Sequence, residues 1–279
     1  MKESKKGLIL LFIIFFIMVL LSYLEVKKTV NDNNLIEEFS GICAHNSDSK
    51  MEDYCKNIDV SNLPSTPDNL TIFYSIMQSE ILYNLPLFAP ILLLVFSTYT
   101  LNRIMKSKYT YYYVQRKKYY DLIKSIIINS YKYVLIVPFI IAFSYLLSLS
   151  ISSHGPNSLT EIMHIATFEK IHYNTKFFIV LYGLNIMLIW LSFINIALII
   201  QSKNRKFIFN IVEFIIIYFL LEMILENLPY NYWLFGIYNL SNISIYNYLL
   251  SSLIYFIISF IILLLSYKNK EKILNRMGV

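Results

Sequence analysis

The sequence lacks the short motifs that mark several large enzyme classes. It has no GxxxxGK[ST] phosphate loop, no HExxH zinc helix, no GxSxG nucleophile elbow and no paired-glutamate motif of membrane proteases. Without a phosphate loop, the chain has no recognisable means of hydrolysing ATP itself. We therefore predict that the chain is not an enzyme and that it holds no cofactor of its own.

Cysteine is also scarce, with Cys43 and Cys55 the two examples in 279 residues. Their spacing matches neither a CxxC motif nor a zinc site. Both lie in one polar segment, where an oxidising compartment would favour a disulfide between them, and two unpaired thiols are the alternative. His154, His164 and His172 lie ten and eight residues apart, which is no metal-ligand spacing, so we predict no metal site.

Charged residues are few as well, at 15% of the chain, whereas 57% of the residues are hydrophobic and the mean hydropathy is +0.54. Long apolar runs recur at intervals, which is typical of a polytopic helical membrane protein. The net charge of +6 would suit a nucleic-acid partner, but the basic residues cluster beside the apolar runs. Membrane spans have such flanks. We therefore predict an all-α polytopic membrane protein that contacts the lipid bilayer and no nucleic acid.

Six apolar segments are predicted to span the membrane. They cover residues 8–24, 85–101, 133–150, 177–200, 207–225 and 247–266. The first ends without a small-residue cleavage site, so we predict an uncleaved span rather than a signal peptide. Pro138 is predicted to bend the third span, and Lys132 to extend toward the interface. Residues 1–279 are thus predicted to form a single transmembrane domain.

Positive charge is unequal between alternate loops. Seventeen lysines and arginines lie in the N-terminus, the loops after spans two and four and the C-terminal tail, and six lie in the other loops. Because basic residues accumulate on the cytoplasmic side, both termini are predicted to be cytoplasmic and residues 25–84 to form a large extracytoplasmic loop. Residues 69–83 have apolar side chains at helical spacing and are predicted to lie along the outer membrane surface.

Three polar residues within the apolar segments are candidates for a substrate pathway: Glu213, Glu222 and Asn185. An ionisable group at membrane depth costs several kcal/mol unless it has a partner or water. The two glutamates are about two and a half helical turns apart, so they face opposite sides of one helix. For Glu213 the alternative is an ion pair with a basic residue of the 202–206 loop. For Asn185, as for Asn195, the alternative is a hydrogen bond that joins two helices.

The loop after the second span is the most basic part of the chain. Residues 102–124 carry seven lysines and arginines against one aspartate, together with the tyrosine-rich sequence YTYYYVQRKKYYDLIK. If residues 109–124 are helical, Tyr113, Lys117 and Tyr120 share one face with the lysine one turn further on. Such a helix either lies on anionic lipid or docks onto a soluble partner, and we favour docking. The candidate contact residues are Tyr109, Tyr113, Arg116, Lys117, Lys118, Tyr120 and Lys124.

These features together resemble the permease subunits of bacterial ABC-2 type transporters. The likeness lies in the first span, the large outer loop, the second span and then the sequence FSTYTLNRIMKSKYTYYYVQRKKYYDLIKS. Its Arg103, Lys106, Arg116–Tyr120 and Lys124 correspond to the basic pattern of the family's loop. The sequence ENLPYNYWLFGIYNLSNIS between spans five and six looks like the family's outer hairpin. The resemblance implies that residues 102–124 form a cytoplasmic coupling loop that fits a groove on a separate ATPase.

The resemblance also implies the function. The chain would be a permease subunit in the bacterial plasma membrane, paired with itself or a second permease, while the partner ATPase binds ATP and Mg. Similar small permeases export peptides or protect cells from antimicrobial peptides, so an amphipathic peptide or lipid-like substrate is expected. Two alternatives remain. One is a sensor or receptor that transports nothing and uses residues 25–84 as its outer domain. The other is a membrane enzyme, which the missing motifs disfavour.

Overall fold

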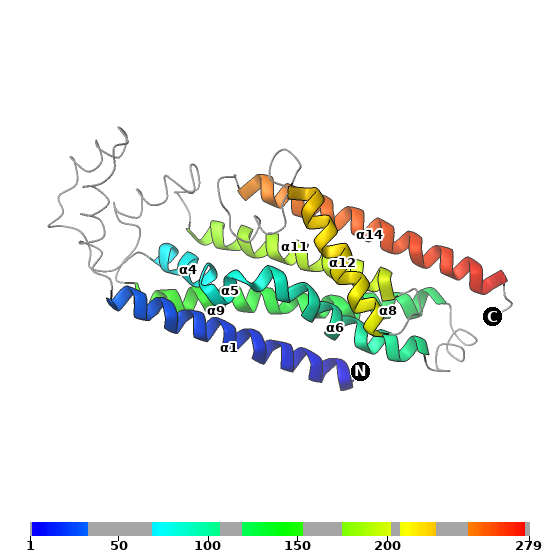
Figure 1. The fold of residues 1–279 in the computed structure, drawn as a ribbon, viewed down its shortest axis with the longest axis horizontal. Helices are drawn as coiled ribbons and strands as arrows, with labels where there is room; N and C mark the ends of the chain where they lie inside the picture. Colours follow the sequence, from blue (N-terminus) through cyan, green and yellow to red (C-terminus); the bar gives the residue numbers. More distant parts are fainter. Residues whose placement is uncertain are drawn as a thin grey trace. The chain divides into compact units, whose positions relative to one another are not determined.

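The computed structural model describes residues 2–32, 69–106, 119–152, 175–201, 207–226 and 245–276. Nearly every residue in these ranges is helical and none is in a strand (Figure 1). The prediction of an all-α protein is therefore confirmed for this part of the chain.

The helices follow the predicted apolar segments. In chain order they are α1 (Lys2–Asp32), α4 (Asn69–Met77), α5 (Glu80–Tyr83), α6 (Leu85–Lys106), α8 (Tyr119–Tyr131), the 3-10 helix η2 (Lys132–Leu135), α9 (Ile136–Ile151), α11 (Thr175–Gln201), α12 (Phe207–Glu226) and α14 (Ile245–Arg276). Five stretches of the described chain are long and apolar enough to cross a membrane: Lys6–Val30, Ile123–Ile151, Ile179–Gln201, Phe207–Leu225 and Leu249–Lys268. They indicate a multi-pass membrane protein.

The second predicted span corresponds to α6, which has 22 residues. At 1.5 Å per residue this helix is about 33 Å long, close to the thickness of the hydrocarbon core. Its described apolar stretch is Phe88–Thr98, and Arg103 and Lys106 lie in the last turns of the helix. The length of α6 thus suits a span.

The chain forms two compact units. One contains residues 1–14, 84–139 and 180–279, and the other contains residues 15–83 and 140–179. The helices α1 and α9 contribute to both, because each passes from one unit into the other.

Helices α1 and α9 lie side by side and run parallel. In the second unit, the rings of Phe16 and Phe143 stack with centroids 4.8 Å apart, and the Tyr23 and Ser150 hydroxyls are 3.0 Å apart. Both residue numbers increase together from the first contact to the second, which defines the parallel direction. The buried positions of α1 recur every three or four residues, as on one face of a helix. Its buried residues are Leu11, Phe15, Val19, Ser22 and Val26.

Helix α4 also packs into the second unit. The Asn69 Nδ2 atom donates a hydrogen bond to the Tyr145 hydroxyl at 3.3 Å, and the Phe73 ring meets the Tyr145 ring edge-on. The apolar residues of the helix are nearly inaccessible: Ile72, Phe73, Ile76 and Met77 are at most 4% exposed. The face expected to lie on the outer membrane surface is therefore covered by protein.

The predicted 69–83 helix is divided in two. Helix α4 ends at Met77, and the Ser79 hydroxyl accepts a hydrogen bond from the Leu82 N–H at 3.4 Å, within α5. A serine before a helix favours this arrangement, since its hydroxyl takes up an amide that has no partner within the helix. The polar residues 78 and 79 thus separate the two helices.

The third predicted span is one helical rod with a tightened turn. Regular helix in α8 gives way to the 3-10 segment η2 and then resumes in α9. Pro138 has no N–H to offer to the carbonyl of Val134, one turn earlier, so the irregularity falls in the turn before the proline. The structure thus has a change of helical pitch before Pro138, and the bend at that residue stays a prediction.

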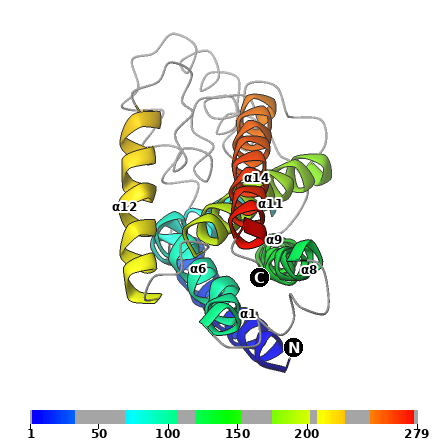
Figure 2. The same cartoon turned by 90° about the vertical axis from the view of Figure 1, so that its right-hand side faces the viewer.

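In the first unit, α6 packs against both α8 and α12, and α8 packs against α14. Figure 1 shows α12 lying obliquely across α6. The turned view of Figure 2 shows α11, α14 and α8 grouped together. Helix α8, whose first turns are the end of the basic loop 102–124, is thus in contact with two other helices of its unit.

Candidate functional site

Helix α11 is the most buried of the five apolar helices. In the apolar stretch of α11, 67% of the residues are buried, against 22% in the corresponding stretches of α12 and α14. Most of its buried side chains are apolar, with Trp190 and Tyr182 the largest. Four are polar: Asn185, Ser192, Asn195 and Gln201. A polar side chain in such surroundings is stable only when it is hydrogen-bonded, so its partners reveal how the helices are joined.

Three hydrogen bonds join α11 to α14. The Ser252 hydroxyl donates to the Asn185 Oδ1 atom, and the Asn195 Nδ2 atom donates to the Ser259 hydroxyl at 3.0 Å. Further along, the Tyr267 hydroxyl donates to the carbonyl of Leu198 at 3.4 Å. Residue numbers rise together on both helices, so α11 and α14 run parallel.

Helices α11 and α12 form an antiparallel hairpin. The Asn210 Nδ2 atom donates to the Gln201 Oε1 atom at 2.6 Å, next to the loop that connects the two helices. Farther from the loop, the rings of Phe193 and Tyr218 meet edge-on with centroids 5.4 Å apart. The residues of α12 that face inward recur every fourth position: Asn210, Phe214, Tyr218 and Glu222.

Two hydrogen bonds connect the last turn of α8 to the rest of the first unit. The Ser130 hydroxyl donates to the carbonyl of Ser97 in α6 at 3.3 Å. The Tyr131 hydroxyl donates to the Asn195 Oδ1 atom in α11 at 2.6 Å. The helix that leaves the basic loop is therefore bonded to a helix on each side.

Asn195 receives one of these bonds and makes another. Its Oδ1 atom accepts from Tyr131 and its Nδ2 atom donates to Ser259, whose hydroxyl donates in turn to the carbonyl of Phe256 at 3.0 Å. The side chain is fully buried, and both halves of the amide are occupied. We call Tyr131, Asn195 and Ser259 the Asn195 clamp, since it joins α8, α11 and α14.

Most of the predicted coupling contacts lie outside the described residues. They are Tyr109, Tyr113, Arg116, Lys117 and Lys118. Tyr120 and Lys124 belong to the first turns of α8, and the Lys124 side chain is exposed. The predicted helix over 109–124 is therefore described from Tyr119 onward.

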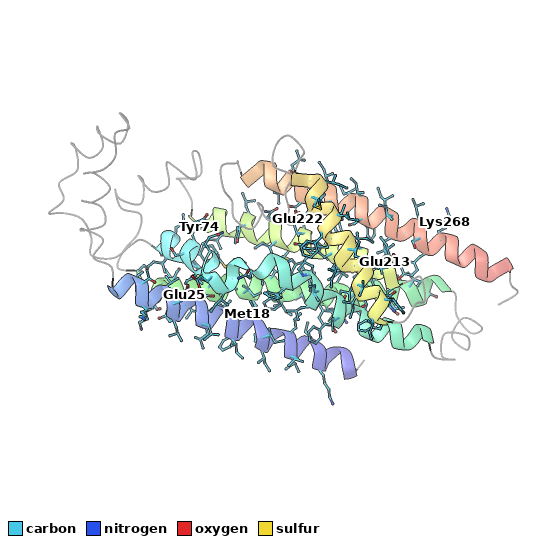
Figure 3. All side chains as sticks on the ribbon, in the orientation of Figure 1. Met18, Glu25, Tyr74, Glu213, Glu222 and Lys268 are labelled. Carbon is cyan, nitrogen blue, oxygen red and sulfur yellow. The ribbon has the colours of Figure 1, made fainter. Side chains whose placement is uncertain are left out.

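The pathway candidates occupy two helices. Glu222 is 5% exposed, whereas Glu213 is half-buried on another side of α12. Figure 3 shows them at different levels of the helix, with Glu213 nearer its N-terminal end. Asn185 is fully buried, and its Nδ2 atom has no hydrogen-bond partner within the described ranges. The two glutamates thus lie at separate positions on α12.

Cys43, Cys55 and the three predicted outer histidines lie outside the described residues. The disulfide therefore stays a prediction. Among the residues that the structure describes, no group of three or more His, Cys, Asp or Glu side chains could hold a metal ion.

The partners Tyr131 and Ser259 were not singled out from the sequence. A signal for Ser259 does exist, because Ser252, Ser259 and Ser266 recur every seven residues and so fall on one face of α14. Tyr131 carries no such signal, since it is one of 24 tyrosines in the chain.

No family model, no curated protein and no solved structure matches this chain.

Proposed function

We propose that the chain is the permease subunit of an ABC-2 type transporter, in which a separate ATPase supplies the energy. The observation that carries the proposal is the bonding of α8. The last residues of the basic loop 102–124 form the first turns of this helix, and Ser130 and Tyr131 at its other end bond to α6 and α11. A protein that docks on the loop would therefore displace α8. The hydrogen bonds of Ser130 and Tyr131 would carry this displacement to α6 and α11.

We further propose six spans with both termini in the cytoplasm. Since α1 and α9 are parallel neighbours, a membrane crossing by both requires the chain to return between them. Helix α6 is long enough for that return. The parallel pair α11 and α14 likewise requires one crossing between them, which α12 supplies. The excess of basic residues in the alternate loops favours the cytoplasm as the side of both termini.

The proposed location is the bacterial plasma membrane, and the proposed substrate is an amphipathic peptide or lipid-like molecule. Residues 25–84 carry ten acidic and four basic side chains, which would attract a cationic peptide at the outer surface. The Asn185 amide could bind a polar group of the substrate within the membrane, because its Nδ2 atom is without a hydrogen-bond partner among the described residues. The second permease would be another copy of this chain or a related one.

Co-purification with an ATPase encoded by a neighbouring gene tests the proposal. We expect wild-type protein to retain the ATPase and a variant with Arg116, Lys117 and Lys118 changed to glutamate to lose it. The matched control changes Lys268, Lys270 and Lys272 to glutamate, an equal charge reversal at the end of α14. An intact complex in the first variant, or equal loss in both, would refute docking at the loop.

A sensor without transport is the second candidate, and one observation favours it. The contacts of Asn69 and Phe73 with Tyr145 connect the outer segment 25–84 to α9, which continues into α8 and the basic loop. A ligand bound outside would then act on the same cytoplasmic surface. This function requires no ATPase, so a chain that binds an outer ligand but never an ATPase would favour the sensor over the permease.

A further inference from the structure

We propose that Asn195 is the positioning residue that makes α8, α11 and α14 move as one body when a partner acts on the basic loop. The identity of that partner rests on the proposed function, whereas the mechanical claim rests on the contacts of the Asn195 clamp.

The clamp holds three helices through one side chain. Tyr131 Oη lies 2.6 Å from Asn195 Oδ1, and Asn195 Nδ2 lies 3.0 Å from the Ser259 hydroxyl. Asn195 is fully buried and Ser259 is 6% exposed, so the bond between them is shielded from water, whereas Tyr131 is half-buried. Separating α8 from α11 would leave polar atoms without partners at membrane depth, which opposes the separation.

Helix α14 follows α11 because it is bonded to α11 at two further levels. These are the bond between Asn185 and Ser252 and the bond from Tyr267 to the carbonyl of Leu198. Together with Asn195, they span 15 residues of α14, about 22 Å at 1.5 Å per residue. A displacement that reaches α11 therefore reaches α14 along much of its length.

The clamp lies at the end of the regular part of its helix. Tyr131 is the last residue of α8, and the 3-10 segment Lys132–Leu135 follows at once, with Pro138 one turn beyond. A 3-10 turn and a proline are the places where a helix bends most readily. Bending is thus expected beyond the clamp, so that α8 stays with α11 and α14.

The test measures the distance between α8 and α14 by double electron–electron resonance. Spin labels are placed at Ile128→Cys and Lys268→Cys, both exposed, in a chain whose Cys43 and Cys55 are replaced by serine. The protein is reconstituted in nanodiscs without a partner. We expect one narrow distance distribution, and a broader one or a second population in the variant Asn195→Leu.

Two further variants make the result specific. Tyr131→Phe removes a single hydroxyl and should also broaden the distribution, while it preserves the ring and the fold. Ser192→Ala is the matched control, because the Ser192 hydroxyl is buried on the same helix but bonds within it, to the carbonyl of Leu188. An unchanged distribution in both Asn195→Leu and Tyr131→Phe, or equal broadening in Ser192→Ala, would overturn the proposal.

The second arm adds the co-purified ATPase with ATP and vanadate. The wild-type distance between residues 128 and 268 should not change on nucleotide binding, since the three helices move together, whereas in Tyr131→Phe it should shift. A nucleotide-dependent change of this distance in the wild type would contradict the proposal. If no ATPase binds the wild type, the proposed function fails, and the arm without a partner still decides the role of Asn195.

Discussion

At the scale of single residues, the buried amides carry the most information. Asn185 and Asn195 were expected to join helices or to line a pathway, and both contact a serine of α14. That an asparagine in a span seeks a partner follows from its polarity alone. The identity of that partner depends on how α11 and α14 pack against one another, and the sequence of α11 by itself does not determine it.

Gly7 is a second residue whose role depends on its neighbours. A Cβ atom at this position would lie 3.1 Å from the Tyr133 hydroxyl and 3.3 Å from the Phe96 ring. Both contacts are tighter than ordinary packing, so the absence of a side chain allows α1 to approach these residues.

Enlarging Gly7 should therefore destabilise the protein. We expect Gly7→Leu to lower the free energy of unfolding by about 1–3 kcal/mol through overpacking. Leucine is the better helix former by almost 1 kcal/mol, so a net loss would identify packing as the cause. The measurement is thermal unfolding in detergent, followed by tryptophan fluorescence. The control Ile13→Phe adds volume at an exposed site of the same helix, and an unfolding temperature equal to the wild type in Gly7→Leu would contradict the close approach.

At the scale of elements, hydropathy predicted where the long helices lie. Five of the six predicted segments coincide with helices long and apolar enough to cross a membrane, because a run of apolar residues satisfies its backbone internally only as a helix. The ends were less predictable. Helix α1 extends to Asp32 and α14 to Arg276, well beyond their apolar runs, since charged residues such as lysine and arginine are also good helix formers.

The contacts between elements were not predictable from composition. The residues 69–83 have an apolar face, and an amphipathic pattern is the same whether that face meets lipid or protein. The contacts of Asn69 and Phe73 with Tyr145 show that this face meets protein. The parallel pairs α1 with α9 and α11 with α14 were unpredictable for a similar reason, because helices that are neighbours in the fold need not be neighbours in the sequence.

Cross-linking checks the parallel pairing of α11 and α14. In a chain without its native cysteines, the pair Asn185→Cys and Ser252→Cys should react with a short bis-methanethiosulfonate, because these side chains are bonded partners. The pair Asn185→Cys and Tyr267→Cys should not react, since residue 267 lies about 22 Å farther along α14. The products are counted by mass spectrometry after proteolysis, and the reverse pattern would show that the helices are antiparallel.

At the scale of the whole molecule, charge and helix direction agree. The basic residues favour cytoplasmic termini, and the two parallel pairs favour one return crossing between their members. Neither argument depends on the other, since one uses loop composition and the other uses contacts such as Tyr23 with Ser150. The parallel direction of the two helix pairs could not be predicted from the sequence. The excess of basic residues in alternate loops could be read from it directly.

Thiol labelling tests the crossing by α6. In intact cells a membrane-impermeant maleimide should label Ser47→Cys in the outer loop but not Ser107→Cys, which follows α6. After permeabilisation both should react, and a chain without cysteines should give no signal. Labelling of both positions in intact cells would mean that α6 does not cross.

The rate of ATP hydrolysis by the partner ATPase tests the central claim most directly. The rate is measured with the ATPase alone, with the wild-type chain in nanodiscs, and with the variant in which Arg116, Lys117 and Lys118 are glutamate. We expect the wild-type chain to change the rate and this variant to leave it unchanged. An ATPase indifferent to the wild-type chain, or one that responds equally to both forms, would contradict the claim that this chain is a permease driven through its basic loop.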